Sequence, residues 1–176
     1  MNQQTLILGL GNVLLTDEAV GAVIVRHLSE MDPDSSRAVY LDGGTLSFTL
    51  AGPIAEALNL IVVDAAAMGE PPGSVRVLEG DAMDRQLSAH AKSVHEVSLS
   101  DLMDMARLTD SLPERRALIG IEPKTVDWGN RLTPEVEQAV PNACNAVLAL
   151  VERWSAAEGD QERTRRGFHD NIEGTQ

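Results

Sequence analysis

Four residues that can do chemistry lie where apolar segments of the sequence end: Glu18, Asp42, Asp64 and His95. Carboxylate oxygens and an imidazole nitrogen together suit nickel, zinc, manganese or iron(II), and three protein ligands leave a coordination position open for substrate. Two carboxylates brought to about 5 Å repel by roughly 3 kcal/mol at an effective dielectric constant near 20, so converging acids need a cation or a shared proton. We therefore predict a site that binds a cation or transfers a proton.

Each of these residues also has a structural interpretation. Asp17 is a good N-cap for the helix that follows it, and Glu18 in the first turn favours the helix dipole. Asp42 stands before two glycines and suits a turn, while Asp64 could cap or turn the chain. A histidine just before a helix, as His95 is, is usually at the surface. Spacing alone leaves both interpretations open.

The elements that must position these side chains alternate between strands and helices. Short, almost uniformly apolar runs predict buried parallel strands, and segments with helical spacing predict helices that cover the sheet. Strands are expected in TLILGLG (5–11), AVYLDGG (38–44), LNLIVVDAA (58–66), PPGSVRVLEG (71–80, at an edge) and RALIGIEP (116–123); helices are expected from Asp17, within 47–58, from Val97 and from Pro134. The pattern predicts the α/β class, a three-layer α/β/α sandwich with a twisted, mostly parallel sheet. In such a sheet the carboxyl ends of the strands face one crevice.

The chain of 176 residues suits a single domain. We expect this domain to cover residues 1–154 and residues 155–176 to form a disordered, charged tail, because apolar periodicity is lost after Trp154.

Composition excludes several classes of partner. With 14 basic and 27 acidic residues, the net charge is −13, which disfavours nucleic acid and anionic membranes. The first residues lack the basic segment of a signal peptide, and no apolar run is long enough to span a bilayer. The single cysteine, Cys144, fits a reducing compartment, so we predict a cytoplasmic protein.

Familiar catalytic and nucleotide-binding motifs are incomplete. The turn at Gly9 and Gly11 lacks the third glycine of a dinucleotide fingerprint and the lysine of a P-loop. His95 and Glu96 begin a zincin motif, but Leu99 stands where the second histidine belongs. The sequence has no G-x-S-x-G nucleophile motif, and Cys144 lies on the apolar stripe of the last helix, where a core role is expected.

Five segments, LGLGNVLLTDEAVG, LDGGT, LIVVDA, VHEVSLSDLM and IGIEPKTVDWGNRLTPEV, resemble those of the nickel-iron hydrogenase maturation endopeptidases. The resemblance covers the chain from about Leu6 to the last helix. It implies a hydrolase that removes the C-terminal extension of a hydrogenase large-subunit precursor after nickel insertion. It also implies that Glu18, Asp64 and His95 are catalytic residues and metal ligands, and that Asp42 contributes to activity or substrate handling.

The resemblance further implies that the partner is the nickel-loaded precursor, which itself supplies the nickel, so the protease need not hold a tight metal of its own. Other divalent cations are expected to occupy the same ligands in vitro. Metal polarisation and a carboxylate-assisted water would hydrolyse the peptide bond, and either carboxylate could be the base. Two alternatives stay open: a noncatalytic nickel-sensing assembly factor and a nucleotide-binding α/β module. The sequence leaves the oligomeric state undetermined.

Overall fold

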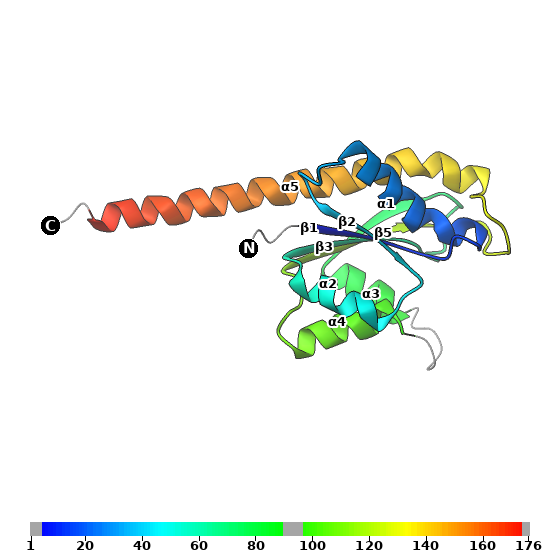
Figure 1. Ribbon diagram of the computed structural model, residues 1–176, viewed down its shortest axis with the longest axis horizontal. Helices are drawn as coiled ribbons and strands as arrows, with labels where there is room; N and C mark the ends of the chain where they lie inside the picture. The colour runs from blue at the N-terminus through cyan, green and yellow to red at the C-terminus, as the bar shows by residue number, and fades with distance from the viewer. Residues whose placement is uncertain (1–4, 90–96, 174–176) are drawn as a thin grey trace.

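A computed structural model describes the backbone of residues 5–89 and 97–173, and the side chains within these ranges up to residue 159. Its strands are β1 (Thr5–Leu10), β2 (Val39–Gly44), β3 (Asn59–Ala65), β4 (Val75–Glu79) and β5 (Arg115–Ile121). They form one sheet in the order β2-β1-β3-β5-β4, in which only the edge strand β4 is antiparallel to its neighbour (Figure 1). The prediction of a mostly parallel sheet is confirmed.

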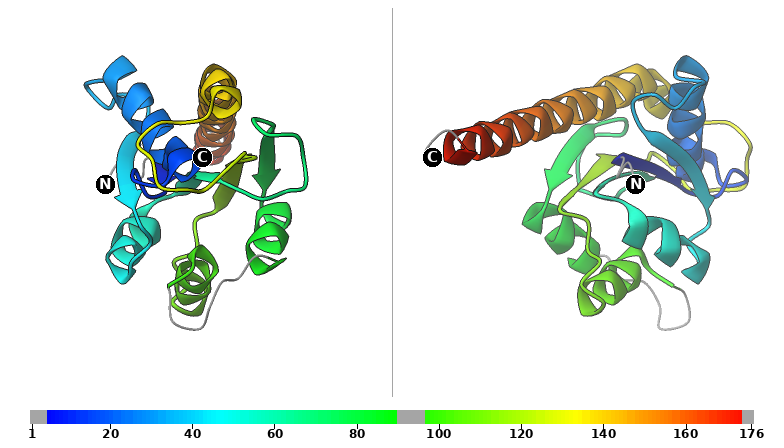
Figure 2. Two further views of the ribbon diagram at one scale, coloured as in Figure 1. Left: turned by 90° about the vertical axis from the view of Figure 1, so that its right-hand side faces the viewer. Right: turned by 60° about the vertical axis from the view of Figure 1, so that its left-hand side comes forward.

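Helices cover both faces of this sheet. They are η1 (Thr16–Ala19), α1 (Val20–Met31), η2 (Phe48–Leu50), α2 (Ala51–Glu56), α3 (Asp81–Ala89), α4 (Leu99–Leu108) and α5 (Pro134–Glu173). Helices α1 and α5 lie on one face, and α2, α3 and α4 lie on the other (Figures 1 and 2). The three-layer α/β/α architecture follows as predicted, although the sequence reasoning did not anticipate α3.

The apolar strands supply both halves of the core. Alternate side chains of β1 and β3 point to opposite faces, so Ile7 and Ile61 pack with α1 and α5, while Leu8 and Leu60 pack with the helices of the other face. Every residue of β1 is buried. This burial on both sides explains why the strand is apolar throughout. Cys144 is buried in the α1 and α5 half of the core, and burial raises the pKa of its thiol, as expected for a core cysteine.

Beyond Trp154, where the sequence predicts a disordered tail, the backbone of α5 continues as a helix to Glu173 and extends well beyond the sheet (Figure 1). Among the side chains described, which reach residue 159, Trp154 is the last buried residue of α5. One turn later the Oε1 atom of Glu158 accepts hydrogen bonds from Asn59 (2.7 Å) and Arg115 (3.3 Å), which tie α5 to the first residues of β3 and β5. Residues added to a helix that has already formed carry no new nucleation cost. The helix can therefore continue beyond the point where its apolar periodicity ends.

A close approach of α1 to the sheet depends on two glycines. A Cβ atom on Gly21 would collide with the backbone carbonyl oxygens of Val63 and Leu10, and one on Gly9 would collide with the carbonyl oxygen of Gly21. In a dinucleotide fingerprint the third glycine allows this kind of helix packing. Here Gly21, ten residues after Gly11, has that role.

We expect Gly21→Ala to lower the free energy of unfolding by about 3 kcal/mol or more, because the added methyl group has no space and backbone must move to admit it. Urea unfolding followed by circular dichroism measures the change. Gly159→Ala in α5 is the matched control: its Cβ would meet nothing within 4 Å, and a helical alanine should stabilise the fold by about 0.5 kcal/mol. Equal stabilities for the two variants would contradict the close-packing role.

Asp32 closes the other end of α1. Its carboxylate accepts hydrogen bonds from the Ser36 hydroxyl (2.8 Å), the Tyr40 hydroxyl (3.0 Å) and the backbone N–H groups of Ser36 and Arg37. These bonds, that from the Ser36 hydroxyl above all, hold the pKa of Asp32 at about 2. Asp32 is therefore a structural carboxylate, at the opposite end of α1 from the carboxyl ends of β1 and β3.

Candidate active site

A cavity of about 730 Å³ opens at the carboxyl ends of the parallel strands. Its lining comes from the loops after β1, β2, β3 and β5, from η1, from α3 and from the start of α4. This is the crevice at which ligands bind in open parallel α/β sheets. This cavity lies where the sequence analysis placed Glu18 and Asp64.

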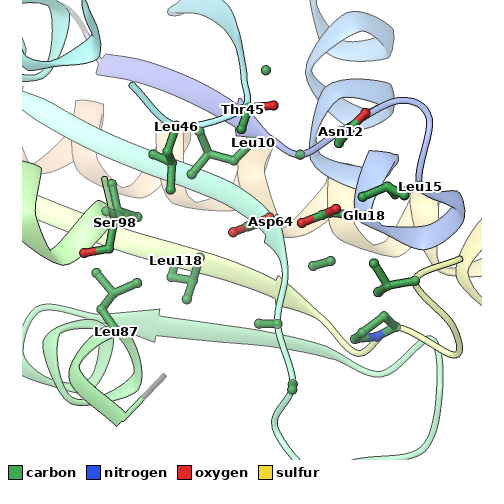
Figure 3. A pocket seen from close by; sticks show the side chains of 18 of the residues that line it. Leu10, Asn12, Leu15, Glu18, Thr45, Leu46, Asp64, Leu87, Ser98 and Leu118 are labelled. Carbon is green, nitrogen blue, oxygen red and sulfur yellow. The ribbon is translucent and has the colours of Figure 1, made fainter. Parts of the chain in front are cut away.

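Glu18 and Asp64 both line this cavity, and their carboxylates are directed toward one another (Figure 3). Glu18 belongs to η1, after β1, whereas Asp64 is the penultimate residue of β3, in register with Gly120 of β5. Both residues are half-buried. The structure therefore brings together two of the three proposed metal ligands, from positions 46 residues apart in the chain.

His95 lies outside the described residues, so its place beside these carboxylates stays a prediction. Within residues 5–89 and 97–159, no group of three His, Cys, Asp or Glu side chains is placed to hold a metal ion. A metal site with three protein or substrate ligands would therefore need a further ligand from elsewhere in the chain or from the substrate. Two opposed carboxylates remain a suitable partial ligand set for a divalent ion.

Asp42 has a different environment. The cavity lining includes Gly44 and Thr45, which follow it, but not Asp42 itself. Its exposed carboxylate accepts a hydrogen bond from the Gly44 backbone N–H (2.9 Å), the geometry of an aspartate that shapes a turn. The contact favours the structural interpretation, and a role in substrate handling stays a prediction.

The glycine turn after β1 places Glu18. Gly11 has φ +131°, and a Cβ atom there would collide with the backbone carbonyl oxygen of Glu18. The Gly11 N–H also donates to the carbonyl oxygen of Gly44 (2.9 Å), which joins the ends of β1 and β2. Gly11 therefore allows the backbone to pack closely against η1. This packing gives the glycine turn before Asp17 and Glu18 a structural role.

Asp17 is not the N-cap that the sequence suggests. It is fully buried, and its carboxylate accepts four hydrogen bonds from the loop after β5: from the backbone N–H groups of Lys124 (2.9 Å), Thr125 (3.1 Å) and Thr133 (2.7 Å) and from the Thr133 hydroxyl (2.9 Å). Burial alone would raise the pKa of Asp17, but these bonds outweigh it and lower the pKa. The partners are 107 to 116 positions away, so no local sequence signal could have revealed them.

Backbone hydrogen bonds hold the same two loops together. The Thr16 N–H donates to the carbonyl oxygen of Gly129 (2.9 Å), and the Gly129 N–H donates to that of Leu14 (2.9 Å). The Thr16 hydroxyl donates to the carbonyl oxygen of Thr125 (2.8 Å). Glu18 is therefore carried on a turn whose neighbours are fixed by a second, distant loop.

Leucine side chains form much of the remaining wall. Leu46 follows β2, Leu87 belongs to α3, and Leu118 belongs to β5 (Figure 3). An apolar wall lowers the local dielectric constant and so strengthens the electrostatic interactions of the two carboxylates. The four-residue spacing of Met83 and Leu87, together with Asp81 and Asp84 in the first turn, was the signal that could have identified α3.

Fold and site together define the class of protein. It is an α/β protein with two carboxylates in the crevice where a nucleotide-binding α/β protein would receive a phosphate. Paired carboxylates in a partly apolar cavity are suited to holding a cation and to moving a proton.

Comparison with known proteins identifies the family. The family model for hydrogenase maturation proteases matches residues 22–150. The hydrogenase expression/formation protein HupD of Rhizobium leguminosarum bv. viciae is 33% identical over 153 residues, which cover 86% of this chain and 76% of the relative. The hydrogenase 2 maturation protease of Escherichia coli (strain K12) is 32% identical over 166 residues, 94% of this chain and 98% of the relative.

A solved structure supports the same assignment. The hydrogenase maturating endopeptidase HybD from E. coli superimposes with a TM-score of 0.76 at 33% identity, over 85% of this chain and 93% of that one. The chain belongs to the hydrogenase maturation protease family. It is accordingly a hydrolase that acts on peptide bonds.

Proposed function

We propose that this chain removes the C-terminal extension of a hydrogenase large-subunit precursor after nickel has been inserted. The observation that carries the proposal is the convergence of the Glu18 and Asp64 carboxylates in one cavity at the carboxyl end of the sheet (Figure 3). Family membership supports the reaction and the class of substrate.

In this proposal the nickel is part of the substrate. Glu18 and Asp64, with His95 as the third ligand, would bind the nickel that the precursor carries, and other divalent cations would bind the same ligands in vitro. The bound ion would polarise the carbonyl group of the scissile peptide bond. One of the two carboxylates would accept a proton from the attacking water, and the proton would pass to the leaving amine as the carbon–nitrogen bond breaks.

The surroundings of the site fit this reaction. The leucine side chains of the wall lower the local dielectric constant, which strengthens the attraction of two carboxylates for a cation. Of the residues that the structure describes, none forms a helix long and apolar enough to cross a membrane. One cysteine, in the core, is consistent with the reducing cytoplasm, where we place the reaction.

Two other functions were open from the sequence, and both are less well supported. A nucleotide-binding module would use free backbone N–H groups in the glycine turn, but the Gly11 N–H already donates to the carbonyl oxygen of Gly44. A noncatalytic assembly factor would bind the precursor without cutting it, whereas the family is one of proteases.

One experiment separates these functions. Purified protein is incubated with nickel-loaded and with nickel-free precursor, and the intact masses are measured. We expect the nickel-loaded precursor to lose the mass of its extension and the nickel-free precursor to stay unchanged. Complex formation without a mass change would support the assembly factor, and cleavage of both precursors alike would exclude recognition through nickel.

A further inference from the structure

Four apolar side chains are exposed on the two loops that hydrogen bonds join beside the cavity. The exposed fractions are 54% for Val13, 53% for Leu14, 48% for Val126 and 82% for Trp128. Large apolar side chains grouped on a surface mark interaction sites more often than scattered ones do. We call these four residues the apolar rim.

The rim is continuous with the active-site cavity. Val126 belongs to the rim and also lines the cavity. Asn12 and Leu15, which flank the two rim residues of the first loop, line the cavity as well. The Gly129 N–H bonds to the Leu14 carbonyl oxygen, which places the residue after Trp128 against the first loop. Both loops lie at the same end of the sheet (Figures 1 and 2).

The rim is also held in place before any partner arrives. The backbone bonds between Leu14, Thr16 and Gly129, together with the four bonds to the buried Asp17 carboxylate, fix both loops. A surface that is already ordered loses little conformational entropy on binding, and an exposed tryptophan on such a surface is the residue type most enriched in binding hot spots.

We propose that the apolar rim is the surface on which the folded body of the precursor docks while its C-terminal segment enters the cavity. The inference rests on the proposed function and adds the surface that recognises the folded part of the substrate. Continuity with the cavity argues for this occupant, because Val126 belongs to the rim and lines the same cavity as Glu18, so a polypeptide that extends from Glu18 past Val126 meets the rim. A second copy of this chain is a poorer occupant, because a net charge of −13 on each copy opposes self-association.

The test compares Trp128→Ala with Leu108→Ala on the full-length protein and nickel-loaded precursor. Leu108 is the matched control, since it is 86% exposed and lies at the end of α4, nine residues beyond the Leu99 that lines the cavity. We expect Trp128→Ala to lower kcat/KM about tenfold or more, mainly by raising KM, with kcat within about twofold of the wild type. Leu108→Ala should stay within about twofold of the wild type in both constants.

A binding measurement keeps this test separate from the chemistry. The chain has two tryptophans: Trp128 is exposed, and Trp154 is 5% exposed in the core. Labelling with 5-fluorotryptophan therefore gives two fluorine NMR signals, and the signal that Trp128→Phe removes belongs to Trp128. Adding precursor should shift or broaden the Trp128 signal and leave that of Trp154 in place. Leu14→Ser should weaken this response.

Several outcomes would overturn the proposal. If the wild type cuts the precursor while Trp128→Ala has an unchanged KM and the Trp128 signal does not move, the rim is not the docking surface even though the proposed function stands. A dimer that Trp128→Ala dissociates in sedimentation, with kcat/KM unchanged, would instead assign the rim to self-association. If the wild type leaves the precursor uncut but the Trp128 signal responds to it, the rim proposal survives and the proposed cleavage fails.

Discussion

Glu18→Gln leaves the nickel-loaded precursor at its full mass, with kcat/KM lowered by about a thousandfold or more. The substitution keeps the size of the side chain but removes the negative charge that faces Asp64 (Figure 3). Loss of a general base costs about 10² to 10⁴ in rate, and loss of a cation ligand adds to it. Intact-mass measurement over a time course of cleavage gives the rate.

Asp64→Asn should have a similar effect, and the double variant should be little worse than either single one, because residues that act as one unit are far from additive. Glu152→Gln, on the exposed face of α5, is the control and should cut at the wild-type rate. Both single variants should keep wild-type stability within about 0.5 kcal/mol, as expected for half-buried side chains at a cavity. Wild-type cleavage by Glu18→Gln and Asp64→Asn together would exclude the carboxylate pair from the reaction.

Asp17→Asn should lower both stability and cleavage. An amide in place of the buried carboxylate removes the charge that four donors share, and it turns an N–H group toward donors that need an acceptor. We expect a loss of about 2 to 4 kcal/mol in the free energy of unfolding. We also expect cleavage to fall at least tenfold at temperatures where the variant is folded, because the turn that carries Glu18 is no longer fixed to the loop at 124–133.

Asp32→Asn is the matched control, since Asp32 also accepts four hydrogen bonds but at the far end of α1. It should lower stability and leave kcat unchanged. If the two variants lose cleavage equally, Asp17 has no special role in positioning Glu18.

The low pKa of Asp17 gives this prediction a dependence on pH. Its pKa in the folded protein lies below the ordinary value of 3.8, so its stabilising contribution is complete well above pH 3.8 and is lost as the pH falls through the folded pKa. Asp17→Asn should therefore destabilise the protein strongly at pH 7 and by progressively less as the pH falls below 3.8. Urea unfolding over a series of pH values measures the difference.

Local sequence patterns were sufficient for the sheet and for the placement of the two acids. Uniformly apolar runs such as LIVVD identify buried parallel strands, and the topology of such strands requires Asp64 and Glu18 to face one crevice. The helix α3 was missed because its apolar face is narrow, with Met83 as its only fully buried residue. Periodicity is a weak signal for so short and polar a helix.

Interactions between distant segments could not be predicted. Asp17 has the composition and position of a helix cap, and only the folded chain shows that its carboxylate belongs to the loop after β5. The extension of α5 past Trp154 was hidden for a related reason, because Glu158 finds its partners Asn59 and Arg115 across the sheet. The role of Gly21 in helix packing depends on the carbonyl oxygen of Val63, 42 residues later.

The separation between Asp17 and its donors at 124–133 also constrains when the enzyme becomes competent during synthesis. A nascent chain that has left the ribosome only as far as β4 already contains Glu18 and Asp64, yet it lacks β5 and every donor that satisfies the Asp17 carboxylate. In such a chain the Asp17 carboxylate could be buried only without its hydrogen-bond partners, which is costly, so the first loop is not held in place. We therefore expect proteolytic competence only after the loop at 124–133 has been synthesised and has folded, and we expect chains that end at β4 to be inactive.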